Sequence, residues 1–192
     1  MRIDSINQLR DVLRYEKPLY PNHLYDWLAL SQRVYNWRFI KALRWAEFFR
    51  FKEKNSHGAL RVAWLICYLL ATRKKNRIGS RIGVEIDVGT FDRGLIVHHN
   101  GSIVVSSNAS IGRDCQLHGD NCIGNTGGPV DSGSPIIGDN VDIGVGAKVL
   151  GNIRIADNVR IGANAVVVDS FDQPGVVIAG VPARKIKMRD DI

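Results

Sequence analysis

Two adjacent histidines, His98 and His99, are the residues of this sequence best suited to acid–base chemistry. An imidazole titrates near neutral pH, so it can take a proton from a hydroxyl group under ordinary conditions. A carboxylate on the second ring nitrogen would hold the tautomer and stabilise the imidazolium. Glu85 and Asp87 lie close to one coil earlier in the repeat described next, where we expect either of them to be stacked beneath the histidines. The residues therefore indicate a general base acting on a hydroxyl.

The strongest pattern in the chain has a period of six residues, with a small residue four positions after most of the aliphatic anchors. The anchors are Ile111, Leu117, Ile123, Ile137, Ile143, Val149, Ile155, Ile161 and Val167. A helix would need a period near 3.6 and a half-buried strand a period of 2. A six-residue unit instead gives one short strand and a turn, and stacking of such units supplies the core. We predict a parallel β-helix of about four coils, with the anchors pointing inward.

The chain divides into three predicted segments. Apolar residues at helical spacing indicate a helical N-terminal domain over 1–77. The repeat indicates a β-helix over 78–176, and a C-terminal tail follows over 177–192. A stretch rich in Gly and Pro interrupts the repeat and predicts a loop extruded at about 126–135. Loops held on a rigid scaffold are frequent places for binding and catalytic residues.

Charge is distributed unevenly over the 192 residues, whose net charge is +7. Residues 1–81 carry 17 Lys and Arg against six Asp and Glu, whereas residues 82–192 carry nine against 13. The basic half predicts contact with an anionic partner such as a nucleotide cofactor or a membrane surface. No nucleic-acid-binding motif accompanies it, so we expect no nucleic acid partner.

The four tryptophans all lie in the helical part, among many arginines. Such a surface either meets an anionic bilayer or packs within an oligomer, and the sequence leaves both open. The polar N-terminus has no signal-peptide pattern, and the most apolar stretch, 59–71, is too short to span a bilayer. We predict a cytoplasmic protein with peripheral membrane contact as one possibility.

Three segments of the chain resemble the hexapeptide-repeat acyltransferases, and within them the serine acetyltransferase branch. These segments are Val97–Val105, Ile143–Ile153 and Ile178–Arg184. The resemblance implies a left-handed β-helix, acetyl-CoA as the donor, and a homotrimer with active sites between neighbouring prisms. It also implies His99 as the catalytic base and Glu85, where the family carries Asp, as its carboxylate partner.

The donor that the resemblance implies has several candidate contacts. Val145 and Ala163 are small and stand one coil apart, which leaves room for the pantetheine arm, and Gly144 permits a close approach of the backbone. Arg184 and Lys185 are expected to meet the phosphates of acetyl-CoA.

The start of the predicted loop is also expected to contact the donor. We assign Asn125 and Thr126 to the cofactor, and backbone N–H groups of 125–128 to the oxyanion of the transition state. The three cysteines form no C-x-x-C pair, so neither a disulfide framework nor a zinc site is expected. Cys115 and Cys122 lie in the repeat core, so the transfer is expected to be direct, without an acyl-enzyme or a metal.

Two departures from the serine acetyltransferase pattern concern the acceptor. His98 stands where the family has Asp, and Gly133-Ser134-Pro135 stands where it has Arg-His-Pro. A zwitterionic amino acid needs charged partners to offset its desolvation. The pattern around His98 and His99 more closely resembles the acetyltransferases of capsule and exopolysaccharide clusters. We therefore predict a sugar hydroxyl as acceptor, contacted by His98, Asn121 and Ser134.

Three other functions stay open at this point. The first is serine O-acetyltransferase activity in cysteine biosynthesis, and the second is a non-catalytic scaffold in a biosynthetic complex. The third is a γ-type carbonic anhydrase, in which His98, His99 and His118 would hold zinc.

Overall fold

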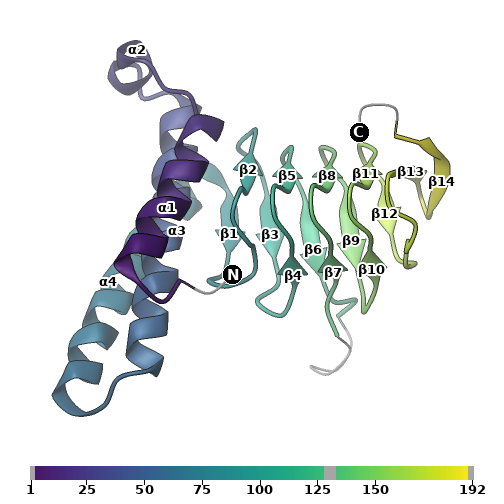
Figure 1. The fold of residues 1–192 in the computed structure, drawn as a ribbon. Coiled ribbons are helices and arrows are strands. Elements are labelled where there is room, and N and C mark those ends of the chain that lie inside the picture. Colours follow the sequence, from purple (N-terminus) through teal and green to yellow (C-terminus); the bar gives the residue numbers. More distant parts are fainter. Residues whose placement is uncertain (1–2, 128–132, 190–192) are drawn as a thin grey trace. The chain divides into compact units, whose positions relative to one another are not determined.

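The structure, a computed structural model, describes residues 3–127 and 133–189 and divides into two compact units (Figure 1). Met1–Gly83 forms a helical unit and Val84–Ile192 forms a β unit. Each unit is described by itself.

The helical unit contains one short 3₁₀ turn and four α-helices in its described residues. They are α1 (Ile6–Glu16), η1 (Lys17–Leu19), α2 (Leu24–Leu28), α3 (Gln32–Lys54) and α4 (Gly58–Ile82). Ser5 caps α1, because its hydroxyl accepts a hydrogen bond from the backbone N–H of Gln8 at 3.2 Å. Within the described part of the chain, no helix is long and apolar enough to cross a membrane.

Helix α4 continues past the predicted end of the helical domain at residue 77. The basic run that starts at Arg73 stays helical, because Arg and Lys are good helix formers. The helix ends only at Gly83, whose φ of 72° gives the left-handed conformation that glycine adopts without a steric penalty. The boundary between the two units therefore lies at Gly83.

The core of the helical unit combines apolar packing with a buried ion cluster. Ile3, Leu9 and Phe48 form one apolar cluster, and further buried apolar residues such as Ile40 and Leu43 lie along α3. The Arg44 side chain is completely buried, and its Nη2 lies 2.7 Å from Glu16 Oε1 while its Nη1 lies 2.9 Å from Glu47 Oε2. Burial alone would lower the pKa of the guanidinium, but the carboxylates of Glu47 and Glu16 hold that pKa above its ordinary value.

Three sheets, parallel except for the last strand β14, form the sides of the β unit. The first contains β1 (Val84–Ile86), β3 (Ile103–Val105), β6 (Cys122–Gly124), β9 (Lys148–Leu150) and β12 (Val166–Val167). The second contains β4 (Ser110–Ile111), β7 (Ile136–Ile137) and β10 (Arg154–Ile155). The third contains β2 (Ile96–Val97), β5 (Gln116–Leu117), β8 (Asp142–Ile143), β11 (Arg160–Ile161), β13 (Val176–Gly180) and β14 (Ala183–Met188). Because the chain visits the three sheets in turn, it winds as a parallel β-helix.

The six-residue repeat is confirmed as the source of this core. Every anchor from Ile111 to Val167 is buried, with at most 3% of its surface exposed. Small residues of the repeat such as Cys115 and Ala147 are fully buried at the corners. Several turns place Asn or Asp at positive φ, a conformation that these two residues tolerate better than most.

The number of residues between positions paired in register is largest at one place along the β-helix. Residues paired in register are 18 apart between β3 and β6 or between β8 and β11, but 26 apart between β6 and β9. The longer spacing places eight additional residues between β6 and β7. This is where the loop at about 126–135 was predicted; its residues 128–132 lie outside the described residues.

The predicted tail from residue 177 is wrong for its first part. β13 pairs in parallel with β11, so Val176–Gly180 adds a further rung to the β-helix. β14 then returns antiparallel along β13, with an irregular register between Val177 and Ile178. The alternation of buried and exposed residues along β13 explains the extension, since Val176 and Ile178 continue the apolar interior.

Candidate active site

His99 lies just after β2, where the chain turns from the third sheet toward β3 of the first. Its imidazole is exposed, and its ring centroid is 6.4 Å from that of His98. Within the described part of the chain, no hydrogen bond or ion pair engages the ring nitrogens of His99. An exposed imidazole whose ring nitrogens make no hydrogen bond can accept a proton from a hydroxyl group that binds beside it.

Glu85 does not lie directly beneath His99, contrary to the stacking that we expected. In β1, Glu85 is paired in register with Val104, because the first coil advances 19 residues from Val84 to Ile103. The carboxylate is exposed, and it makes no hydrogen bond with another described residue. Asp87, which follows the same strand, is exposed as well, so both carboxylates remain candidate partners.

His98 belongs to a ladder of polar side chains on the third sheet. Its Nε2 lies 2.9 Å from the amide oxygen of Gln116. Its ring stacks on that of His118 at a centroid separation of 4.3 Å and an angle of 14°. His98 therefore faces along the sheet toward the next coil.

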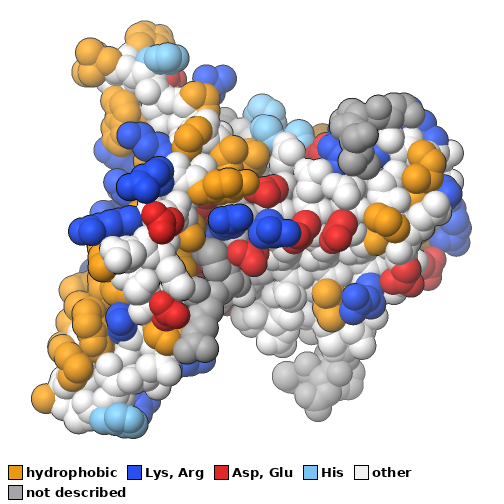
Figure 2. Space-filling view, viewed as in Figure 1, with side chains coloured by type: hydrophobic (Ala, Val, Ile, Leu, Met, Phe, Trp, Pro, Cys, Tyr) orange, Lys and Arg blue, Asp and Glu red, His pale blue; other side chains and the backbone are white. Residues whose placement is uncertain are grey.

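The ladder continues through two further coils. His118 Nε2 is 2.8 Å from Asp142 Oδ1, so the imidazole donates a hydrogen bond to the carboxylate. The other oxygen of Asp142 accepts a hydrogen bond of 3.1 Å from Arg160 Nε. These contacts join groups of both signs into one partly exposed network. In Figure 2, histidine side chains gather over the part of the β unit that carries β2 and β5.

Sequence reasoning missed this ladder, although a signal for it exists. Gln116, Asp142 and Arg160 are paired in register on consecutive coils. Their separations of 26 and 18 residues become comparable only after the eight extra residues of the loop are removed. His118 then falls two residues after Gln116, on the same outward side of the strand.

Asn121 was assigned to the acceptor, and this assignment is wrong. Its side chain has no exposed surface, accepts a hydrogen bond from Gly119 N at 3.0 Å and donates one to Gly144 O at 2.8 Å. It stands four residues after Leu117, which is the small inward position of the repeat. The repeat itself therefore predicted burial, and Asn121 supports the corner.

Ser134 lies beside the first and second sheets rather than on an open surface. Its side chain is buried, and its Oγ is 3.3 Å from Ser106 Oγ. Within the described residues of the loop, Gly133 is partly buried and Pro135 is buried. The segment therefore offers no exposed cation for an acceptor.

The residues assigned to the pantetheine arm lie on two neighbouring coils. Val145 and Ala163 are both exposed, and the backbone N–H of Asn164 donates to Val145 O at 2.8 Å. Gly144 has a structural role, because a Cβ there would come within 2.7 Å of Ala163 N and Ile161 O. These exposed small side chains leave room for an extended chain lying across the coils.

The polar residues assigned to the donor are also exposed. Asn125 Oδ1 accepts a hydrogen bond from Gly127 N at 3.2 Å, which shapes the start of the loop, and Thr126 follows it. On β14, Arg184 Nη1 lies 2.9 Å from Asp169 Oδ2, and the ammonium of Lys185 donates to Gln173 Oε1 at 2.8 Å. Both cations are on the surface, where a phosphate can compete for them.

Cys115 is not suited to act as a nucleophile, whereas Cys122 is partly exposed and does not lie in the repeat core as predicted. Burial raises the pKa of the Cys115 thiol to about 12, so it is protonated at neutral pH. Its Sγ donates to Gly138 O at 3.2 Å. His98, His99 and His118 do not converge on one point, because two of them stack face to face and point their Nε2 atoms at other residues. No group of three metal-binding side chains occurs among the residues that the structure describes.

Known proteins resemble the chain over most of its length. No family model matches the sequence. A serine acetyltransferase of Staphylococcus aureus (strain Mu50 / ATCC 700699) is 36% identical over 144 residues, which cover 69% of this chain and 67% of that protein. Soybean serine acetyltransferase complexed with serine superposes with a TM-score of 0.69 at 26% identity, covering 93% of this chain and 69% of that one.

A third protein supports the fold. Serine acetyltransferase from Brucella abortus strain S19, in complex with coenzyme A, gives a TM-score of 0.72 at 23% identity and covers 96% of this chain and 70% of that one. The sequence match to the Staphylococcus aureus enzyme spans two thirds of both chains, and the superpositions include the helices as well as the β-helix. These likenesses and the confirmed repeat lead to one conclusion: the chain is an acyltransferase and belongs to the serine acetyltransferase family of hexapeptide-repeat acyltransferases.

Proposed function

We propose that the protein transfers the acetyl group of acetyl-CoA to the hydroxyl of L-serine, with His99 as general base. The observation that carries the proposal is the exposed, unengaged imidazole of His99 in a chain whose relatives are serine acetyltransferases. The soybean relative has been solved with serine bound, which supports an amino-acid acceptor over the sugar hydroxyl that the sequence favoured.

The proposed reaction is a direct transfer. His99 takes the proton of the acceptor hydroxyl as its oxygen attacks the thioester carbonyl. The new C–O bond forms, the C–S bond breaks, and the imidazolium returns the proton to the departing thiolate of CoA. Backbone N–H groups at the start of the loop, near Asn125, are proposed to stabilise the oxyanion. The high pKa of Cys115 supports a route without an acyl-enzyme on that thiol.

The donor is proposed to lie across neighbouring coils. Val145, Ala163 and Gly144 would hold the pantetheine arm, with Asn125 and Thr126 beside it. Arg184 and Lys185 are exposed on β14, which supports a role with the phosphates. Acetyl-CoA supplies the activated acyl group.

The polar ladder is proposed to replace the Arg-His pair that the family uses for the acceptor. His118 donates to Asp142, whose other oxygen accepts a hydrogen bond from Arg160. The stacked imidazoles of His98 and His118 are proposed to offer hydrogen bonds to serine. The guanidinium of Arg160 brings a permanent cation into the ladder, which supports a zwitterionic acceptor.

A sugar hydroxyl is the second candidate acceptor. Gly133, Ser134 and Pro135 provide no charged side chain, and a neutral sugar needs none. The resemblance to acetyltransferases of capsule and exopolysaccharide clusters rests on His98 and on the absence of the Arg-His pair before Pro135.

Three further features belong to the same proposal. Left-handed winding and a homotrimer with sites between prisms follow from the family resemblance. Glu85 is proposed as the carboxylate partner of His99, and its exposed, unbonded side chain supports this. Because the two residues are not bonded in the described chain, the contact would form with substrate or across subunits.

The experiment measures CoA release from acetyl-CoA by the purified full chain, with L-serine and a panel of sugars and glycans as acceptors. We expect turnover on L-serine. His99→Ala should lower kcat about 10²–10⁴-fold, the usual contribution of a general base. His57→Ala is the matched control, because His57 is an exposed histidine at the start of α4.

Further variants separate the roles. His118→Gln should raise KM for serine more than it lowers kcat, whereas Glu85→Gln should lower kcat. Turnover on a carbohydrate alone would establish the second candidate. Near-normal turnover of His99→Ala would overturn the proposed base.

A further inference from the structure

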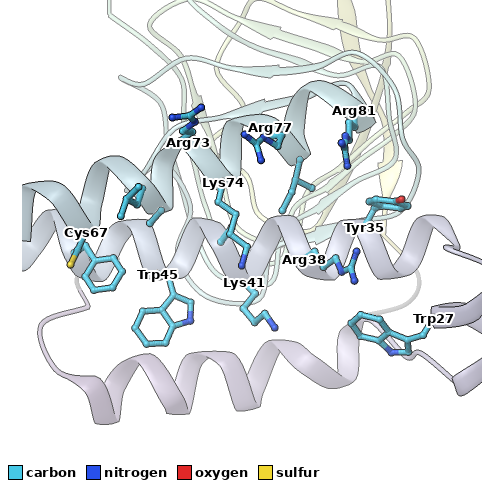
Figure 3. Close-up of a pocket in the computed structure, with 15 residues that line it drawn as sticks. Trp27, Tyr35, Arg38, Lys41, Trp45, Cys67, Arg73, Lys74, Arg77 and Arg81 are labelled. Atoms are coloured by element: carbon cyan, nitrogen blue, oxygen red, sulfur yellow. The ribbon is translucent and has the colours of Figure 1, made fainter.

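A groove between α3 and α4 of the helical unit has a volume of about 1160 Å³ (Figure 3). Its walls come from α2, from one face of α3 and from one face of α4. Aromatic and aliphatic side chains, among them Trp27, Trp45 and Leu70, line it together with several basic residues. All of these residues belong to the one unit, so the groove does not depend on the placement of the other.

Six of the lining residues are cations, and none is an acid. Arg73, Lys74, Arg77 and Arg81 follow one face of α4, opposite Arg38 and Lys41 of α3 (Figure 3). Arg38 lies over the ring of Trp27 at 5.1 Å from its centroid. The side chains of the other five cations make no ion pair or hydrogen bond with any residue that the structure describes.

Three glutamates of the helical unit are engaged elsewhere. Glu16 and Glu47 bind the buried Arg44. Glu53 binds Arg50 at 3.1 Å and Arg61 at 2.9 Å. Because no acid lines the groove, its six cations repel one another unless an anion joins them.

One end of the groove is apolar. The rings of Trp45 and Phe49 pack at a tilt, with a centroid distance of 5.4 Å. Leu70 lines the same part of the groove, and 62% of its surface is exposed. The apolar surface continues along α4 through Ile66 and Leu69, which are both more than half exposed.

Helix α2 provides a second apolar region, since Leu24, Tyr25 and Leu28 are each about three-quarters exposed. Figure 2 shows Lys and Arg side chains on the helical unit between hydrophobic groups at α2 and at the end where α4 begins. Cations flanked on two sides by exposed apolar side chains match the chemistry of a lipid surface, with anionic headgroups beside acyl chains.

We propose that this face of the helical unit binds a membrane surface, with anionic phospholipid headgroups in the groove and the apolar side chains of α2 and α4 in contact with the lipid. Charge complementarity distinguishes this occupant from a second copy of the chain. A two-fold contact centred on the groove would bring Lys74, Arg77 and Arg81 close to their own counterparts. A bilayer engages the cations and both apolar regions at once, whereas a free phosphate engages only the cations.

The experiment is sedimentation of the full chain with vesicles of phosphatidylcholine alone or mixed with phosphatidylglycerol. We expect binding only to the mixed vesicles, and weaker binding as salt is raised, because salt screens the attraction. Arg77→Glu/Arg81→Glu should weaken vesicle binding by about tenfold or more. Arg10→Glu/Lys54→Glu changes the net charge by the same amount at exposed sites outside the groove and should retain most of the binding.

Two more measurements separate the sources of the anion. Ile66→Ser/Leu69→Ser should weaken vesicle binding while CoA release from acetyl-CoA stays unchanged. Inorganic phosphate at millimolar concentration should not displace the protein from vesicles. Absence of vesicle binding, equal binding to phosphatidylcholine, equal loss in both charge-reversed variants, or binding of free phosphate alone would each overturn the proposal. A change of oligomeric state in Arg77→Glu/Arg81→Glu without vesicle binding would assign the face to a second copy.

Discussion

The two units place charge and apolar surface in opposite ways. The helical unit buries the Arg44 ion cluster and exposes apolar side chains along α2 and α4. The β-helix buries its aliphatic anchors, while ion pairs such as Arg113–Asp139 lie on its surface. A repeating unit assigns the same environment to the same position on each coil, whereas each contact of the helical unit occurs once.

This difference concerns how stability is distributed. In the β-helix, a lost contact has equivalents on the coils above and below. In the helical unit, one buried guanidinium pairs with two buried carboxylates, so a single change removes this cation from both. We therefore expect the most sensitive positions to lie in the helical unit.

Arg44→Ala should have the largest effect on stability. It leaves Glu16 and Glu47 buried without their cation, at a cost of about 3–5 kcal/mol in the free energy of unfolding. Urea unfolding followed by tryptophan fluorescence would report it, because all four tryptophans lie in this unit. Arg50→Ala is the matched control, since Arg50 also pairs with a glutamate but is 40% exposed. Surface ion pairs contribute below about 1 kcal/mol. A loss of unfolding free energy that small in Arg44→Ala would show that the helical unit is no more sensitive than the β-helix.

Gly144→Ala should cost less, because it acts on the packing between two coils. The new Cβ would come within 2.7 Å of backbone atoms of Ala163 and Ile161, so the coils must shift, at about 1–3 kcal/mol. In Gly124→Ala the added Cβ meets only Ser106 Cβ at 3.5 Å, an ordinary contact. Thermal unfolding followed by circular dichroism compares the two, and equal stabilities would contradict the observed close approach.

Ile161→Val should cost about 0.5–1.5 kcal/mol, because it removes one methylene from a fully packed anchor. The neighbouring coils carry Ile143 and Ile178 in register, and they limit the loss to that site. The free energy of unfolding, measured with denaturant, is compared with that of Ile136→Val, which changes an exposed isoleucine in the same way. The comparison tests whether burial determines the loss. A similar loss in both variants would contradict the inward assignment.

Arg113→Ala should have the smallest effect. Hydrogen bonding and charge from the exposed Arg113 lower the pKa of Asp139. A lowered carboxyl pKa stabilises the folded state above the unfolded pKa near 4, and this contribution is lost as pH falls through the folded pKa. The variant should therefore differ slightly from the parent at neutral pH and match it in strong acid. NMR titration should show the Asp139 pKa rising toward its ordinary value, and an unchanged pKa would contradict the pairing.

The sequence predicted the fold of the β unit better than the details of its site. Period six places each anchor inward without knowledge of the loop, which explains why Ile111 through Val167 were assigned correctly. The ladder depends on which residues stack between coils, and the eight extra residues conceal that register. Asn121 was misassigned because a polar side chain was taken as functional, although its repeat position required burial.

Glu85 and the end of α4 show a second difficulty. Glu85 stands only 14 residues before His99, whereas the first coil advances 19 residues, so the carboxylate is paired with Val104 and does not lie beneath the histidine. The basic run after Arg73 gave no stop signal for the helix, and only Gly83 ended it.

The last strand has a consequence for assembly. A parallel β-helix that stopped at a full rung would present unpaired backbone groups on which another molecule could continue the stack. β14 occupies that edge along the third sheet, runs antiparallel, and carries Arg184, Lys185 and Lys187. An incoming parallel strand would meet the wrong strand direction at this edge, so β14 disfavours end-to-end growth along the third sheet.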